Sequence, residues 1–211
     1  MSDKIISASV NPQMAATEPG RNHLFPVFLK LESLSLLIVG GGYVSMEKLK
    51  TVLQNSPGAN IRVVATIISS EIKQLVAQKD KIELIERPYQ PTDIDNADIV
   101  IVAVDDVSVS EQVSKDAKVK GKLVNVADKP ALCDFYLGSV VQKGSLKIAI
   151  STDGKSPTIA KRIKELLNET LPDEIDNLLV NMQQIRNKIS GDFAEKVKQL
   201  NEITKKLSRN Q

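Results

Sequence analysis

The sequence predicts an α/β fold built on a doubly wound parallel sheet. Apolar runs rich in Val, Ile and Leu occur at residues 34–39 and 98–104, and segments with helical spacing separate these runs from others like them. Strands that are buried on both faces read as continuous apolar runs, and helices between them imply parallel pairing. Because such crossovers are right-handed, the helices are expected on both faces of the sheet.

The expected elements follow one another along the chain up to about residue 130. Strands are expected at residues 34–39, 61–65, 82–85, 98–104 and 123–126. Helices are expected at residues 46–54, from a cap at Ser69 or Ser70 onward, and at residues 109–120. Apolar residues recur every three or four positions in each of these helices, so one face of each can pack on the sheet.

The pattern changes after Pro130. Two extended segments, residues 135–141 and 146–150, either form a hairpin or pair with a second subunit. Helices are expected at residues 157–167, 173–189 and 192–207, with mixed charges that suit solvated faces.

Composition excludes several functional classes. Lys and Arg number 28 against 26 Asp and Glu, and aromatic residues make up only 3% of the 211 residues. This composition argues against nucleic-acid binding. One cysteine and one histidine exclude an intramolecular disulfide and the usual zinc cluster. No apolar run could span a bilayer and no secretory signal is seen, so we expect a cytoplasmic protein that does not bind membranes.

A glycine-rich segment, Gly40-Gly41-Gly42-Tyr43-Val44-Ser45, follows the first strand and opens the first helix. Gly40 permits a tight turn, Gly42 lets the backbone approach a pyrophosphate, and the helix N-terminus supplies N–H donors for it. Ser45 stands where the motif G-x-G-x-x-G has its third glycine, and it is small enough for close packing. A glycine turn without a ligand is the alternative, but the strand–turn–helix–strand context favours a Rossmann-type nucleotide site.

The acid that usually binds the adenosine ribose, about 20 residues on, is missing. Thr66 and backbone groups of Ile67 could bind the ribose instead, and no Arg follows to bind a 2′-phosphate, so NAD is preferred over NADP. Asp105 and Asp106 come directly after the fourth strand. One of them is expected to line the cofactor and the other to cap the next helix.

Two further segments could carry chemistry. Asp128, in the segment Asn125 to Pro130, could accept a proton while hydride leaves a substrate, although the residues alone favour an ordinary turn. Ser156 and Pro157 suit a helix start, and Lys155 with the basic residues behind it would attract anions. Taken alone, this segment is better explained as a capped helix. Cys133 is expected to be a buried or half-buried thiol rather than a nucleophile, since no histidine is near to activate it.

Taken together, these segments resemble the precorrin-2 dehydrogenase/sirohydrochlorin ferrochelatase family, which includes the N-terminal module of siroheme synthase. The matching segments are residues 25–29, 37–48, 102–106, 125–130 and 148–157. The last two are the most specific. Ser45 departs from the family's usual alanine, and Tyr43 is bulky for its position.

The resemblance implies oxidation of precorrin-2 to sirohydrochlorin with NAD⁺ as hydride acceptor. Asp128 matches the essential aspartate that acts as general base. The implied cofactor positions are Gly40, Gly41, Gly42, Tyr43, Val44, Thr66, Ile67 and Asp105, and the implied substrate positions are Asn125, Thr152, Lys155 and Ser156. The resemblance also implies a homodimer. It leaves open whether Fe²⁺ or Co²⁺ is inserted into the product, a step in which Asp128 could take part.

The expected organisation has four parts. A flexible tail covers residues 1–22, an NAD-binding Rossmann domain residues 23–132, a dimerisation and substrate region residues 133–170, and a C-terminal helical region residues 171–211. No methyltransferase module follows, so uroporphyrinogen methylation is expected from another protein. The alternative function is a regulatory module that senses NAD(H) without catalysis, which would need the glycine turn but not Asp128.

Overall fold

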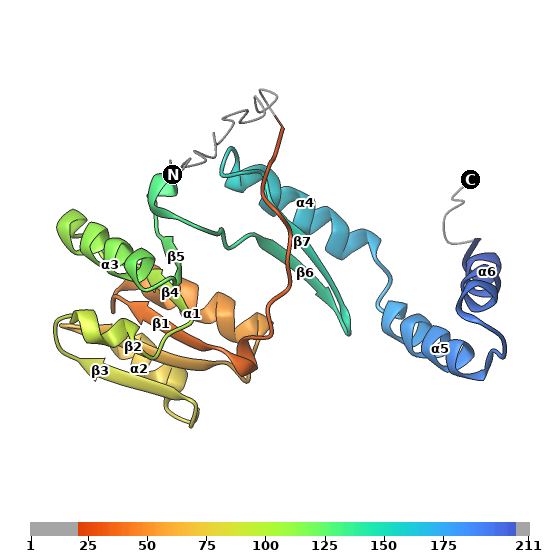
Figure 1. Ribbon diagram of the computed structural model, residues 1–211, viewed down its shortest axis with the longest axis horizontal. Coiled ribbons are helices and arrows are strands. Elements are labelled where there is room, and N and C mark those ends of the chain that lie inside the picture. The colour runs from red at the N-terminus through yellow and green to blue at the C-terminus, as the bar shows by residue number, and fades with distance from the viewer. Residues whose placement is uncertain (1–20, 206–211) are drawn as a thin grey trace, which may run out of the picture.

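A five-stranded parallel sheet forms the larger part of the molecule (Figure 1). The computed structural model describes residues 21–205, so residues 1–20 of the predicted tail and residues 206–211 lie outside it. The sheet has the order β3-β2-β1-β4-β5. Its strands are β1 (Ser35–Val39), β2 (Asn60–Ala65), β3 (Ile82–Glu86), β4 (Ile99–Val102) and β5 (Leu123–Val126). Strands β1 to β3 are added toward one edge of the sheet, and β4 and β5 are added on the other side of β1. This reversal of the strand order confirms the predicted doubly wound fold.

The helices cover both faces of this sheet. On one face lie α1 (Tyr43–Asn55) and α2 (Ser70–Val76), and on the other lie α3 (Val107–Val119) and the 3₁₀ turn η2 (Pro91–Ile94). Alternate residues of β1 point to opposite faces, so Ile38 packs with α1 and α2, and Leu37 packs with α3. A further 3₁₀ turn, η1 (Leu31–Ser33), precedes the sheet.

Several predicted boundaries differ from the structure, and two of the differences have a clear physical reason. Helix α1 begins at Tyr43 rather than at residue 46, because Gly42 serves directly as its N-cap. The expected strand at residues 135–141 begins only at Ser139. Phe135 and Leu137 instead pack against the core beneath α1 and α2, and the buried amide of Asn125 donates a hydrogen bond to the Phe135 carbonyl at 2.8 Å. These residues therefore belong to a connection that is tied to the sheet.

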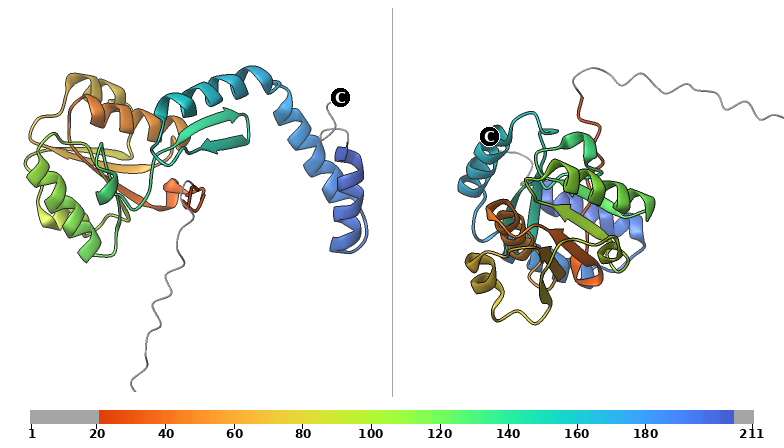
Figure 2. Two further views of the ribbon diagram at one scale, coloured as in Figure 1. Left: turned by 90° about the horizontal axis from the view of Figure 1, so that it is seen from above. Right: turned by 90° about the vertical axis from the view of Figure 1, so that its left-hand side faces the viewer.

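The hairpin alternative for the two late strands is confirmed. Strands β6 (Ser139–Lys143) and β7 (Leu146–Ile150) pair antiparallel, with Gly144 and Ser145 as the turn. The 3₁₀ turn η3 (Pro130–Leu132) leads toward the hairpin, and α4 (Pro157–Thr170) packs mainly on β6. Figure 2 shows the hairpin and α4 standing out from the sheet.

Two further helices, α5 (Ile175–Lys188) and α6 (Phe193–Thr204), extend away from the rest of the molecule (Figure 1). The first turn of α5 meets the hairpin tip, where Asp176 accepts a hydrogen bond from the Ser145 backbone at 2.7 Å and Lys143 pairs with Asp173. These contacts lower the pKa of both carboxyl groups. None of the helices in residues 21–205 is long and apolar enough to cross a membrane.

Candidate cofactor-binding site

The three glycines after β1 have different surroundings. A Cβ on Gly40 would lie 2.1 Å from the Ala103 carbonyl oxygen, and one on Gly41 would lie 2.1 Å from the Ile67 carbonyl oxygen. A Cβ on Gly42 would meet nothing within 4 Å. The first two glycines therefore let the turn pack against the loops that follow β4 and β2. The third leaves open space at the start of α1, which fits a phosphate group bound by helix N–H donors.

Ser45 explains why a small residue is required in the third position of the motif. Its side chain is fully buried and its hydroxyl donates a hydrogen bond to the Gly40 carbonyl oxygen at 2.6 Å. The bond closes the glycine turn against the first turn of α1. A larger side chain at this position would push the helix away from the turn.

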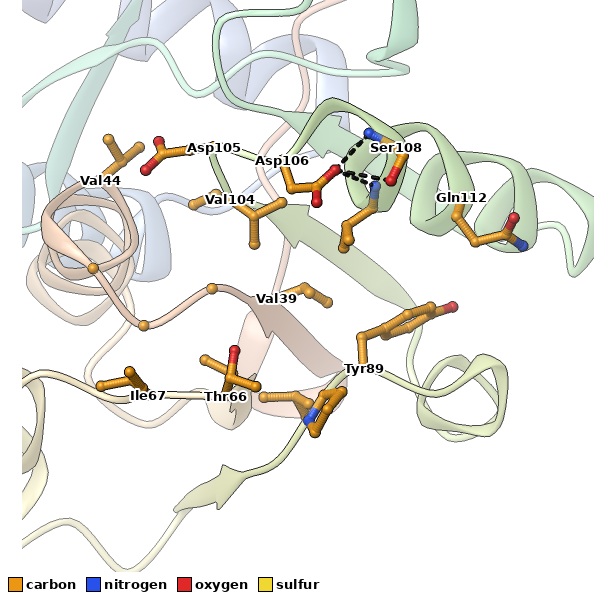
Figure 3. A pocket seen from close by; sticks show the side chains of 18 of the residues that line it. Val39, Val44, Thr66, Ile67, Tyr89, Val104, Asp105, Asp106, Ser108 and Gln112 are labelled. Atoms are coloured by element: carbon orange, nitrogen blue, oxygen red, sulfur yellow. Dashed lines mark hydrogen bonds between the residues drawn. The ribbon is translucent and has the colours of Figure 1, made fainter.

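A cavity of about 810 Å³ opens at the carboxyl ends of the strands (Figure 3). It lies at the point where the strand order reverses, which is where ligands bind in open α/β sheets. Its volume suits a dinucleotide, since cofactor pockets commonly span about 300–1,000 Å³. All eight positions predicted for the cofactor line it: Gly40, Gly41, Gly42, Tyr43, Val44, Thr66, Ile67 and Asp105.

The loop after β2 is fastened to the glycine turn. Ser69 donates its backbone N–H to the Gly41 carbonyl oxygen at 2.9 Å, and Ile68 donates to the Glu86 carboxylate at 3.1 Å. Lys73 pairs with Glu86 at 2.9 Å, and these hydrogen bonds lower the pKa of Glu86. Sequence reasoning missed Glu86, although an acid at the end of the third strand, beside the expected ribose site, was a visible signal.

The two acids after β4 make different contacts. Asp106 is the N-cap of α3 and accepts hydrogen bonds from the backbone of Ser108 at 2.8 Å and Val109 at 3.2 Å. Hydrogen bonds from Ser108 and these backbone groups lower its pKa. Both acids line the cavity, and the Asp105 carboxylate, which caps no helix, is the one that could bind a ligand there.

Tyr43 stands at the rim of the cavity and is 71% exposed. Its hydroxyl donates a hydrogen bond to Glu47, one turn along α1, at 3.1 Å, and this bond raises the pKa of the phenol. The bond holds the end of the side chain along α1.

Asp128 follows β5 and is exposed, with the backbone in the left-handed region at a φ of 57°. Left-handed backbone is uncommon for a residue other than glycine, and such residues gather at functional sites. Asn125 is 5% exposed, and its amide is used by Phe135. Neither residue lines the cavity.

The Lys129 ammonium is buried without a hydrogen-bond partner among the described residues, and its charge contributes to the lowered pKa of Asp106.

The loop before α4 is a compact turn. The Thr152 hydroxyl donates to the Ser156 carbonyl oxygen at 3.1 Å, and the Ser156 hydroxyl accepts the backbone N–H of Ile159 at 3.2 Å. Ser156 is therefore the predicted N-cap, with Pro157 as the first helical residue. Lys155 is exposed. The substrate roles of Asn125, Thr152, Lys155 and Ser156 stay predictions, since these residues do not line the cavity.

Cys133 is half-buried, as expected, and its thiol donates a hydrogen bond to the Val126 carbonyl oxygen at 3.2 Å. Within residues 21–205, no group of three or more His, Cys, Asp and Glu side chains is arranged to bind a metal ion.

The sheet, the glycine turn and the cavity define a nucleotide-binding protein of the Rossmann type. A family model described as putative NAD(P)-binding matches residues 27–139, and the model of the central part of a sirohaem biosynthesis protein matches residues 143–170. The chain therefore binds a nicotinamide cofactor through its first half.

Relatives identify the family more closely. The siroheme synthase of Psychrobacter arcticus is 36% identical over 82% of this chain, and that of Mannheimia succiniciproducens is 33% identical over 83%. The chain spans about a third of these relatives, at 30% and 34% of their lengths. A solved structure described as SirC, precorrin-2 dehydrogenase, is 30% identical and has a TM-score of 0.69, covering 88% of this chain and 93% of that one. The chain belongs to the precorrin-2 dehydrogenase family.

Proposed function

We propose that this protein oxidises precorrin-2 to sirohydrochlorin with NAD⁺ as the hydride acceptor. The observation that carries the proposal is the cavity at the carboxyl edge of the sheet, which brings together all eight positions expected for the cofactor. The likeness to SirC, which extends over nearly the full length of both chains, supports the same function.

Asp128 is the general base in this proposal. In open sheets of this topology the nicotinamide half of a dinucleotide lies on the β4–β5 side of the switch point, and Asp128 directly follows β5. NAD⁺ bound there would supply the hydride acceptor for the substrate. The Asp128 carboxylate is exposed and takes the proton that the substrate must also lose.

We propose NAD rather than NADP as the cofactor. A 2′-phosphate next to Thr66 and Ile67 would need a cation, and Lys73, the nearby basic residue of α2, is already paired with Glu86 at 2.9 Å. The Glu86 carboxylate also adds negative charge beside this loop, which disfavours a further phosphate.

The assembly we propose is a homodimer formed through the hairpin and α4. Ile159, Ile163 and Leu166 lie on one stripe of α4 and are between 38% and 60% exposed. A second copy would cover them. The loop before α4, with Lys155 exposed, would then contribute positive charge for the carboxylates of the tetrapyrrole substrate.

The test compares Asp128→Asn and Asp128→Ala with the wild-type protein. Asn keeps the shape of the side chain and tolerates left-handed backbone, so Asp128→Asn isolates the loss of the base. We expect unchanged NAD⁺ binding by titration and a fall of about 100-fold or more in precorrin-2 oxidation followed by absorbance. Glu111→Gln, on the exposed face of α3, is the matched control.

Two results would contradict the proposal. Wild-type turnover in Asp128→Asn would remove Asp128 as the base. A wild-type protein that binds NAD⁺ but leaves precorrin-2 unchanged would favour the NAD(H)-sensing alternative. Sirohydrochlorin with Fe²⁺ or Co²⁺ in the same assay tests the metal insertion that the family resemblance leaves open.

A further inference from the structure

Two polar side chains at one end of the cavity share a single carboxylate. The Tyr89 hydroxyl donates a hydrogen bond to Asp116 Oδ2 at 2.9 Å, and Gln112 Nε2 donates to Asp116 Oδ1 at 2.8 Å. Tyr89 and Gln112 line the cavity, whereas Asp116 does not. Figure 3 shows both side chains at the opposite end of the cavity from Val44 and Ile67. The carboxylate thus fixes two cavity walls without reaching the cavity itself.

The topology indicates which part of the cofactor lies at this end. The pyrophosphate fits at Gly42, and in this fold the adenosine half lies on the β2 side of the switch point. Tyr89 follows β3, the strand next to β2, while Asp128 follows β5 at the other edge of the sheet. Val39, Val64 and Pro88 add apolar surface beside Tyr89. A flat aromatic base fits this apolar end of the cavity better than a phosphate or a sugar does.

We propose that Tyr89 and Gln112 recognise the adenine ring of the cofactor and that Asp116 is the residue that positions both of them. Tyr89 provides an aromatic surface on which the base stacks, and its hydroxyl bond to Asp116 sets the direction of the ring. Burial and this bond raise the pKa of Tyr89, so the hydroxyl remains a donor.

The Asp116 carboxylate also determines which atom of the Gln112 amide is available to a ligand. A carboxylate only accepts hydrogen bonds, so the Gln112 amide must turn its NH₂ group toward Asp116. Its carbonyl oxygen then remains for a donor in the cavity. Adenine has such a donor in its 6-amino group, whereas hypoxanthine has an oxygen acceptor in the same place. The arrangement therefore favours NAD⁺ over nicotinamide hypoxanthine dinucleotide.

The loop that carries Tyr89 has other anchors, which makes the inference testable. Arg87 forms two hydrogen bonds with the Asp93 carboxylate, at 2.9 and 2.6 Å. Lys120, at the end of α3, binds Asp95 at 2.6 Å and the Pro91 carbonyl oxygen at 2.6 Å. Removal of the Asp116 carboxylate should therefore free the two side chains while the loop stays in place.

The experiment titrates the full chain with three ligands: NAD⁺, nicotinamide hypoxanthine dinucleotide and nicotinamide mononucleotide, which lacks the adenosine. We expect Tyr89→Ala to weaken NAD⁺ binding about tenfold, because the adenine ring loses its stacking surface, and to leave the mononucleotide unaffected. Tyr89→Phe keeps the ring and should lose less. Gln112→Ala and Asp116→Ala should both abolish the preference for NAD⁺ over the hypoxanthine dinucleotide.

Lys120→Met is the matched control, because it removes the other link between the same helix and loop and should leave all three affinities unchanged. Equal losses for NAD⁺ and the mononucleotide in Tyr89→Ala would overturn the inference, and so would an unchanged preference in Asp116→Ala. The inference concerns the cofactor of the proposed function, but binding is measured without turnover. A failure of Asp128 as the base would therefore leave these results intact.

Discussion

The two halves of the molecule bury their apolar residues to different extents. In the sheet half, residues such as Leu37 and Ile38 are 0% exposed, and β4 is buried along its whole length. In the other half, α4 buries only Ala160, and α5 and α6 bury no residue. The cofactor half thus encloses its own core. The three late helices leave large apolar side chains exposed, such as Ile159 on α4, Leu179 on α5 and Ile203 on α6.

This difference in burial affects how the helices of the two halves are stabilised. A helix of 12 to 14 residues is only marginally stable by itself in water, and packing of its apolar face supplies most of its stability. Leu166 on α4 is 60% exposed and Phe193 on α6 is 84% exposed. The comparison therefore predicts that substitutions in the first half change the stability of the chain, while those in the second half change its assembly.

The largest expected effect comes from a matched pair of leucines. Leu37→Ala removes a fully buried side chain between the sheet and α3, and should lower the free energy of unfolding by about 3 kcal/mol. Leu166→Ala should change it by less than about 1 kcal/mol in a monomer, because its side chain is already in water. Urea unfolding at low protein concentration measures both.

For dimerisation, the relative size of the two effects should be reversed. Leu166→Ala is expected to shift the protein from dimer to monomer in analytical ultracentrifugation, whereas Leu37→Ala at a temperature where it stays folded should not. A Leu166→Ala protein that sediments as the wild type does would remove α4 from the proposed dimer interface.

The next effect concerns a buried ion pair in the first half. Asp93 is 3% exposed and accepts two hydrogen bonds from Arg87 and one from the Gln90 backbone at 2.8 Å. Asp93→Asn should cost about 2–3 kcal/mol, because the guanidinium loses its charged partner. Asp95→Asn is the control, since its exposed pair with Lys120 should contribute less than about 1 kcal/mol.

The pH dependence of this pair has a definite sign. The Arg87 guanidinium lowers the pKa of Asp93 in the folded protein. Its contribution is therefore complete above the ordinary Asp value of about 4 and is lost as the pH falls through the lower folded value. Unfolding free energies of wild type and Asp93→Asn should converge as the pH falls below about 4. A difference that grows in acid would contradict the assignment.

The sequence was most informative where structure depends on neighbours in the chain. Gly40 to Val44 form a local motif. Thr66 and Ile67 follow one strand and Asp105 follows another, and both strands are evident as apolar runs. All these positions could therefore be placed at one edge of the sheet. Tyr89 and Asp116 are 27 residues apart, and no local pattern shows that they meet. Phe135 and Leu137 read as strand because they are apolar, whereas tertiary contacts with Asn125 and the core hold them in a connection.

The smallest expected effect comes from one substitution made in each half. Ser69 caps α2 and Ser156 caps α4, and each hydroxyl accepts the backbone N–H three residues on, at 3.4 and 3.2 Å. Either change to Ala should cost its own helix about 1 kcal/mol. In Ser69→Ala the loss should appear in global urea unfolding, because α2 packs on the sheet core through Ile72.

Ser156→Ala should instead appear as faster amide hydrogen exchange in α4, with little change in the global transition of the monomer. Helix α4 lies on the hairpin and contributes one buried residue, so its opening exposes little core. If Ser156→Ala lowered the global free energy of unfolding as much as Ser69→Ala, the two halves would unfold as one unit. The apolar stripe of α4 would then have to be stabilised within the chain rather than by a second copy.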